Sequence, residues 1–396
     1  MAKLSDIRKA FRKSVGSIDA SESAMAKVTE FLDSGSYAIN RVLTGDIHKG
    51  FPMGRISTIY GESGSGKSLL AANAIVDALK NKNFQAVYYF DSEGGALWDY
   101  IKAGGVDLSM IEHVPVHSIE DCATKILQLY DSLVEAADEY KKDPDNNEEP
   151  RILCVLDSFG ALAADKLVTD AAKDKMAQDM GLGAKLKNNM MRGLMMRVVQ
   201  SNCPLIIVNH TYSDPAAMFT SKVKAIPGGE GIRYASHVML QMTKLLVKSG
   251  DTEFLTGGEN DKDKTGFYKG NRIRAFCVKN RVAIPCYEAT MFIDFQNGIA
   301  KYDGLIEDAV NGWWDEDEKG EPTIHTHYID EVRGGYVVPS YSDKKVSYKE
   351  LISNDKIWDT FIDKFNEESI KHMQYSNKVT RMLDDIEREN GISDED

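Results

Sequence analysis

The sequence predicts an α/β protein whose core is a mostly parallel, twisted sheet with helices on both faces. Strand-like runs alternate with helix-like segments from Arg55 onward, and this alternation is typical of parallel sheets. A glycine-rich octapeptide lies between the first strand-like run and the first helix-like stretch. An apolar run over 151–157 ends in the carboxylate of Asp157, and open α/β sheets place their ligands at such strand ends.

The expected elements follow in order along the chain. Seven apolar runs are predicted to be strands, over 55–60, 86–90, 113–116, 151–157, 204–209, 238–248 and 273–278. The stretch 69–80, which is rich in alanine and leucine, is predicted to be the helix after the octapeptide. Two polar stretches interrupt the alternation, and we expect a surface loop over 141–149 and the tip of a long mobile hairpin over 249–271.

The two ends of the chain are predicted to differ from this core. Residues 4–15 place basic side chains around Leu4, Ile7 and Phe11 at helical spacing, so we expect a small basic helix, either a lid on the core or a docking arm for a partner. Beyond about residue 302 the pattern becomes acidic and aromatic, which predicts a small α+β domain over 302–383 with helices near 348–365. Residues 384–396 are predicted to form a disordered acidic tail.

The octapeptide has the spacing of a phosphate-binding loop. It matches the pattern G-x-x-x-x-G-K-[ST], and its residues are Gly61, Glu62, Ser63, Gly64, Ser65, Gly66, Lys67 and Ser68. Glycines allow successive backbone N–H groups to surround a polyphosphate, and the N-terminus of the following helix favours the same anion. We expect Lys67 to reach the β- and γ-phosphates and Ser68 to bind Mg²⁺. The sequence therefore predicts a site for a nucleoside triphosphate with Mg²⁺.

Polar side chains end three of the predicted strands, and we expect them beside this loop. Asp157 is the candidate that holds Mg²⁺ through its water shell. Glu93 follows the strand 86–90 and is the candidate base that orients and deprotonates the attacking water, with an exposed loop acid as the simpler alternative. His210 follows the strand 204–209 and is a candidate sensor of the γ-phosphate, although a histidine at a strand end is often only a hydrogen-bonded side chain.

Composition limits the classes of protein to which the chain can belong. It has 396 residues, 42% of them hydrophobic, and a formal net charge of −13, which argues against a uniformly basic nucleic-acid binder and leaves room for a local basic channel. No apolar run is long enough to cross a membrane and the N-terminal residues are not signal-like, so we expect a cytoplasmic protein with no membrane partner. The cysteines form no C-x-x-C pair and are predicted to be buried free thiols, with no metal site beyond Mg²⁺; they are Cys122, Cys154, Cys203, Cys277 and Cys286.

Together these residues resemble the RecA recombinase family over about 35–310. The segment 91–97, Asp-Ser-Glu-Gly-Gly-Ala-Leu, followed by Tyr100, is similar to the family segment that carries a catalytic glutamate and a tyrosine that stacks on adenine. The resemblance therefore implies ATP as the nucleotide, supports Glu93 as the base and assigns Tyr100 to the adenine ring. Cellular members usually carry glutamine at the sensor position, where this chain has His210. In the segments 89–93 and 209–212, and in its acidic terminus, the chain looks closer to phage UvsX-type recombinases.

Two further segments, about 173–190 and 211–229, resemble the two DNA-binding loops of the family. The first leads into a methionine-rich, basic stretch, and the resemblance implies DNA contacts at Met180, Gly181, Lys185, Lys187 and Arg192. The second closes on a glycine pair, and its implied contacts are Met218, Phe219, Lys222, Lys224, Gly228 and Gly229. Cations that follow phosphates and apolar groups that stack on bases suit a single strand. On composition alone, both segments would be interpreted as flexible lids with incidental lysines.

Lys279 and Arg281 stand where the family places basic residues that reach the ATP of a neighbouring subunit. The resemblance implies that they act in trans and stabilise γ-phosphate charge in an assembled filament. Without the family, a lysine and an arginine at a strand end would be interpreted as solvated charges.

The resemblance implies a DNA-dependent ATPase and recombinase that forms helical filaments on single-stranded DNA, pairs it with homologous duplex DNA and exchanges strands. Residues 1–34 would then serve oligomerisation and 35–301 would form the ATPase core, while a loader and a single-strand-binding protein are further candidate partners. If a phage encodes the chain, its expected location is the host cytoplasm. Two alternatives stay open. A ring-forming helicase or motor is disfavoured by the pair of loops, and a regulatory ATPase or mediator is disfavoured by the presence of Glu93, Lys279 and Arg281.

Overall fold

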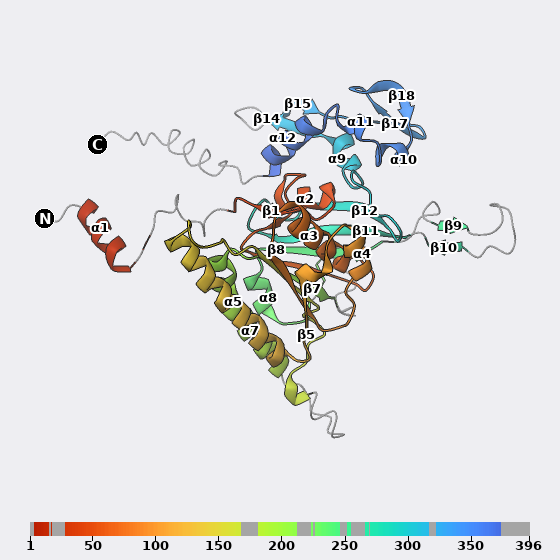
Figure 1. Cartoon of the computed structure of the whole chain (residues 1–396). Coiled ribbons are helices and arrows are strands. Elements are labelled where there is room, and N and C mark those ends of the chain that lie inside the picture. The colour runs from red at the N-terminus through yellow and green to blue at the C-terminus, as the bar shows by residue number, and fades with distance from the viewer. Residues whose placement is uncertain are drawn as a thin grey trace. The chain divides into compact units, whose positions relative to one another are not determined.

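The whole chain is drawn in Figure 1, a computed structural model that describes residues 4–15, 17, 28–167, 181–211, 223–224, 226–245, 252–254, 266–268, 270–316 and 322–373. The chain divides into two compact units. The first comprises 1–32, 51–60 and 67–237, and the second comprises 33–50, 61–66 and 238–396. The domain limits expected from the sequence, at residues 34, 301 and 383, stay a prediction.

A parallel sheet forms the centre of the first unit, in the strand order β3-β7-β6-β4-β5. β4 pairs in parallel with β5 and β6, and β6 pairs in parallel with β7. The strands are β3 (Ile56–Gly61), β4 (Ala86–Asp91), β5 (Ile111–Pro115), β6 (Ile152–Asp157) and β7 (Leu205–His210). The register sets Asp91 opposite Asp157, so the polar ends of β4 and β6 lie side by side. The predicted parallel sheet is confirmed here.

Helices pack on this sheet as the alternation predicts. α3 (Lys67–Asn81) contacts β4, β6 and β7. α5 (Ile119–Lys142) and α7 (Leu182–Ser201) run side by side in Figure 1 and share a core with alternate residues of the same strands. α5 continues two residues into the stretch that was expected to be a loop, 141–149. The unit also contains α1 (Leu4–Val15), as predicted, with β1 (Phe31–Leu32), β2 (Phe51–Pro52), α4 (Trp98–Ala103), the 3₁₀ turn Leu108–Met110 and α8 (Glu230–Ala235).

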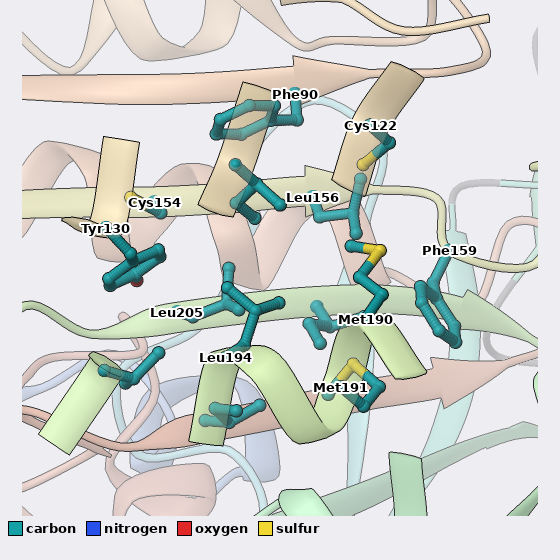
Figure 2. Packing of buried hydrophobic residues seen from close by; sticks show 14 of the residues in the cluster. Phe90, Cys122, Tyr130, Cys154, Leu156, Phe159, Met190, Met191, Leu194 and Leu205 are labelled. Atoms are coloured by element: carbon teal, nitrogen blue, oxygen red, sulfur yellow. The ribbon is translucent and has the colours of Figure 1, made fainter. Parts of the chain in front are cut away.

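The core beneath α5 and α7 is built from large apolar side chains. Figure 2 shows Phe90, Leu156 and Leu205 of the sheet together with Tyr130 of α5 and Leu194 of α7. Each such side chain contributes about 1.5–3 kcal/mol when it is removed from water. All five cysteines are free, and four of them are buried as predicted. The prediction of a buried thiol is wrong for Cys286, which is exposed and lies between β11 and β12.

The sheet of the second unit is antiparallel, in the order β13-β12-β11-β8. Its strands are β8 (Val238–Lys244), β11 (Gly270–Asn280), β12 (Glu288–Asp294) and β13 (Gly298–Ile299). β11 pairs with β8 and with β12 in antiparallel register, so the predicted strands 238–248 and 273–278 run antiparallel to each other. β9 (Thr252–Phe254) and β10 (Gly266–Tyr268) form the antiparallel pair of the expected hairpin. Its last two residues, 270 and 271, begin β11, whereas residues 249–251, 255–265 and 269 lie outside the described residues.

A helix and a mixed C-terminal region complete the second unit. α2 (Tyr37–Thr44) packs against β11 and β12, and its buried Arg41 forms an ion pair with Asp308 at 2.6 Å and donates to Ser369 at 3.0 Å. The later elements are α9 (Ile306–Asn311), β14 (Trp313–Glu316), β15 (Pro322–Thr326), β16 (Asp330–Val332), β17 (Gly335–Val338), β18 (Ser342–Val346), α10 (Tyr348–Leu351), α11 (Asp355–Trp358) and α12 (Ile362–Met373). The predicted acidic tail lies outside the described residues. Within the described ranges, no helix has the length and apolar character needed to span a membrane.

Candidate functional site

The predicted phosphate loop follows β3 and leads into α3. Gly64 and Gly66 have φ of 69° and 87°, in the left-handed region that glycine adopts without strain. The side-chain amide of Asn271 donates to the carbonyl of Gly64 at 2.9 Å, which holds the loop against β11. The buried hydroxyl of Ser65 has no hydrogen-bond partner among the described residues. Because buried polar groups are normally paired, this orphaned hydroxyl fits a loop that receives a polyphosphate.

A hydroxyl and a carboxylate lie in contact at the beginning of α3. Ser68 Oγ donates to Asp157 Oδ2 at 2.8 Å, and the neighbouring Lys67 is buried. Hydroxyl and carboxylate oxygens are suitable ligands for Mg²⁺, so the pair fits the predicted ion. Burial raises the pKa of Asp157, while hydrogen bonds from Ser68 and Tyr89 and the charge of Lys67 lower it. The structure therefore brings the predicted metal residues together.

Glu93 lies on a turn at the end of β4, and hydrogen bonds from neighbouring residues hold this turn in place. Asp91 Oδ1 accepts the backbone N–H groups of Glu93 at 3.0 Å and Gly94 at 2.7 Å. Ser92 Oγ donates to the carbonyl of Ser158 at 2.8 Å and accepts the N–H of Ser158 at 2.9 Å. These bonds tie the end of β4 to the end of β6, so the turn is held from two strands.

The carboxylate of Glu93 meets a histidine from a third strand. Glu93 Oε1 lies 2.8 Å from Nε2 of His210, which ends β7. The same oxygen accepts a hydrogen bond from Ser158 Oγ. The side chains of Glu93 and His210 are 37% and 33% exposed, so water can reach the pair. The predicted base and the predicted sensor are therefore in direct contact.

Tyr100 lies on α4 and is tied to the helix that follows the phosphate loop. Its hydroxyl donates to Asn73 Oδ1 of α3 at 2.7 Å, and the residue stays 37% exposed. Burial raises the pKa of Tyr100, so the hydroxyl remains a donor at neutral pH. A partly exposed ring fixed at its far end suits the adenine contact that the resemblance implies.

The end of the second predicted DNA segment is attached to the strand that carries His210. Asn209, one residue before His210, donates to the carbonyl of Pro227 at 3.0 Å. Gly228 has φ of 107°, and a Cβ there would lie 2.5 Å from the ring of Phe159. The position therefore accepts only glycine without rearrangement.

The other predicted DNA contacts differ in exposure. On α7, Lys185 and Arg192 are exposed, as is Gly181 at the N-cap. Lys187 lies on the buried side of the same helix, where its Nζ donates to the Gly160 carbonyl at 3.3 Å and lies 5.2 Å from the ring centroid of Phe159. A buried ammonium that is already engaged is a poor phosphate contact, so Lys187 differs from its neighbours.

In the second segment Lys224 and Gly228 are half-buried and Gly229 is exposed. Met180, Met218, Phe219 and Lys222 lie outside the described residues. DNA contact at all of these positions stays a prediction.

Comparison with known proteins identifies the family. Residues 1–300 match the RecA N-terminal domain. The chain belongs to the RecA family. It is 30% identical over 309 residues to "Protein RecA" of Aquifex aeolicus, a match that covers 78% of this chain and 77% of that protein. It is also 30% identical over 283 residues to "Protein RecA" of Treponema denticola, covering 71% of this chain and 59% of that protein.

A phage protein is among the relatives as well. The "Recombination and repair protein" of Enterobacteria phage T4 is 25% identical over 346 residues, which cover 87% of this chain and 76% of that protein. The predicted family and its RecA-like α/β core are confirmed.

In this RecA-family chain the predicted trans residues lie in the second unit, at the end of β11. The register of β11 against β8 shifts between Cys277 and Lys279, and Arg281 follows as an exposed residue. Burial, and then the charge of Arg281, lower the pKa of Lys279 to about 8. Their action in trans stays a prediction.

Three residues of the site were not singled out from the sequence. Tyr89 donates its hydroxyl to Asp157 Oδ2 at 2.9 Å, Ser158 holds Glu93, and Asn73 holds Tyr100. Burial and the nearby carboxylates strongly raise the pKa of Tyr89. A signal for Tyr89 was present, because strand alternation places it on the same face as Asp91, two residues later.

Proposed function

We propose that the protein is an ATP-dependent recombinase that assembles on single-stranded DNA and exchanges strands with a homologous duplex. Membership of the RecA family and the recombination and repair name of the phage T4 relative support this proposal. ATP binds on the loop 61–68, with Lys67 at its phosphates and Tyr100 at its adenine, and Ser68 and Asp157 hold Mg²⁺. When bound, Mg²⁺ neutralises charge on the transferring phosphoryl group.

The contact between Glu93 and His210 is the observation that carries the proposal. The carboxylate of Glu93 takes the proton of the attacking water, and the bond from Ser158 to Oε1 and the turn fixed by Asp91 keep it oriented. His210 adjoins Asn209, which holds Pro227 at the end of the second DNA segment. A change at the phosphate end of the site can therefore bias the conformation of that segment.

Exposed cations and an exposed helix face support DNA binding and self-assembly. Lys185 and Arg192 on α7 follow the phosphates of the strand, and Lys279 and Arg281 complete the site of the next protomer. α1 leaves Ile7, Phe11 and Val15 more than half exposed, at 55%, 60% and 57%. Because their four-residue spacing sets these side chains on one side of the helix, α1 is a docking arm for a second copy of the chain.

The test is the rate of ATP hydrolysis with and without single-stranded DNA, with negative-stain images of the same samples. The wild type is expected to be strongly stimulated by DNA and to form helical filaments. The double variant Lys279→Ala/Arg281→Ala is expected to lose stimulation, because it cannot complete the neighbouring site. Lys344→Ala/Lys349→Ala, which removes two exposed charges elsewhere, is the matched control and should retain it.

Other outcomes would favour the rival functions. Closed rings with translocation along DNA would indicate a helicase or motor. ATP turnover that does not depend on DNA, with full activity in the Lys279→Ala/Arg281→Ala variant, would indicate a regulatory ATPase.

A further inference from the structure

We propose that Tyr89 is a positioning residue for the metal-binding carboxylate of Asp157, which it orients through its buried hydroxyl. The inference rests on the proposed function, since it assumes that Asp157 and Ser68 hold Mg²⁺ with ATP. It adds a residue whose hydroxyl acts through Asp157 and not on the nucleotide itself.

The two side chains meet because of the parallel register of β4 and β6. Tyr89 lies opposite Val155, and Asp91 lies opposite Asp157. Side chains two residues apart on a strand share a face, so the ring of Tyr89 runs along the sheet toward the end where Asp157 stands. Its hydroxyl donates to Asp157 Oδ2 at 2.9 Å, and the same oxygen accepts Ser68 Oγ at 2.8 Å.

The hydroxyl is held in place by the packing of its ring. Tyr89 is 3% exposed and meets Trp98 edge to face, with centroids 5.1 Å apart. Trp98 meets His113 in the same way at 5.4 Å, and His113 Nε2 lies 3.1 Å from Asp91 Oδ2. Asp91 in turn fixes the turn of Glu93. Three packed aromatic side chains therefore connect the carboxylate of Asp157 with the turn that carries Glu93.

A hydrogen bond to a ligating group changes metal affinity even though the donor does not touch the ion. Loss of such outer partners typically weakens metal binding by about 10- to 100-fold. Tyr89→Phe removes the hydroxyl and keeps the ring against Trp98. Ser68 still reaches Asp157 in this variant, so we expect a loss near the lower end, about tenfold.

The experiment measures the affinity for a fluorescent ATP analogue as a function of Mg²⁺ concentration, and again with excess EDTA. Tyr89→Phe should need about ten times more Mg²⁺ for half-maximal binding, while its metal-free affinity stays within about twofold of the wild type. Tyr88→Phe is the matched control, because Tyr88 points to the opposite face of the same strand and packs against the core beneath α5 and α7. It should match the wild type in both titrations.

Three results would overturn the inference. The first is an unchanged Mg²⁺ titration for Tyr89→Phe. The second is an equal shift in Tyr88→Phe, and the third is an equal loss of affinity with and without metal, which would assign the hydroxyl a merely structural role. A wild type that binds no ATP analogue at any Mg²⁺ concentration would instead overturn the proposed function, and this inference with it. Thermal melts of all three proteins establish that each is folded under the conditions of the titration.

Discussion

Replacing Lys187 by methionine should change the stability of the protein and leave its phosphate contacts unchanged. The ammonium of Lys187 is buried over the ring of Phe159 and donates to the carbonyl of Gly160. Lys185, two residues earlier on α7, is exposed. Both lysines belong to the segment that resembles a DNA-binding loop, so the pair tests whether Lys187 is structural while Lys185 contacts DNA.

The magnitudes follow from the contacts. A desolvated cation–π contact is worth about 2 kcal/mol, and a hydrogen bond from a charged donor about 1.5–3 kcal/mol. The lost stabilisation is partly offset because Lys187→Met no longer buries a charge. We therefore expect a net loss of about 2 kcal/mol in the free energy of unfolding. Each phosphate contact on a single strand contributes about 0.7 to the slope of log K against log salt concentration. Lys185→Met should therefore lower that slope by about 0.7, and Lys187→Met should leave it unchanged.

Urea unfolding and fluorescence anisotropy with a labelled oligonucleotide at several salt concentrations measure the two quantities. Lys185→Met is expected to unfold like the wild type. The reasoning is refuted if Lys187→Met lowers the salt slope as much as Lys185→Met does while its stability stays at the wild-type value.

The remaining predictions concern the base, the trans cations and the second unit. Glu93→Gln should reduce DNA-stimulated turnover by at least about 100-fold, because general base catalysis contributes that much, while equilibrium ATP binding is retained; unchanged turnover would remove Glu93 from the mechanism. Burial and the charge of Arg281 lower the pKa of Lys279 to about 8, so its ammonium loses its proton as pH rises through that value. DNA-stimulated ATP turnover should therefore fall as pH rises through about 8. Arg281→Ala removes the like charge and should move any remaining decline to higher pH, whereas a decline at an unchanged pH would show that Lys279 does not cause it. Asp308→Ala removes the carboxylate partner of the buried Arg41 and should lower the free energy of unfolding by about 3 kcal/mol, measured with urea. A loss below about 1 kcal/mol, typical of surface ion pairs, would contradict that account.

The elements of the first unit were predictable because their signals are local. The helix 4–15 has its predicted bounds, and the octapeptide lies between a strand and a helix as its pattern requires. The strand ends carry Asp157, Glu93 and His210 to one edge of the sheet. Parallel strands end at the same edge, so the sequence alone predicts that these three side chains lie together.

Strand direction in the second unit could not be predicted from the same signals. The apolar runs of β8 and β11 resemble those of the parallel strands, and their antiparallel pairing depends on long-range contacts. The burial of Lys187 was different, since a signal for it was present. Positions 183, 187, 190, 191, 194 and 198 form the buried side of α7, a spacing that matches the helical period. The charge of Lys187 and its family context predict a DNA contact, whereas its position on the helix indicates a buried side chain.

The most direct test of the account is transfer of a labelled strand from duplex DNA to a homologous single strand, with ATP and Mg²⁺. A recombinase is expected to transfer the strand only when the two DNAs share sequence, and only when both Glu93 and the Lys279 and Arg281 pair are intact. Efficient ATP turnover on single-stranded DNA without homology-dependent transfer would contradict the account.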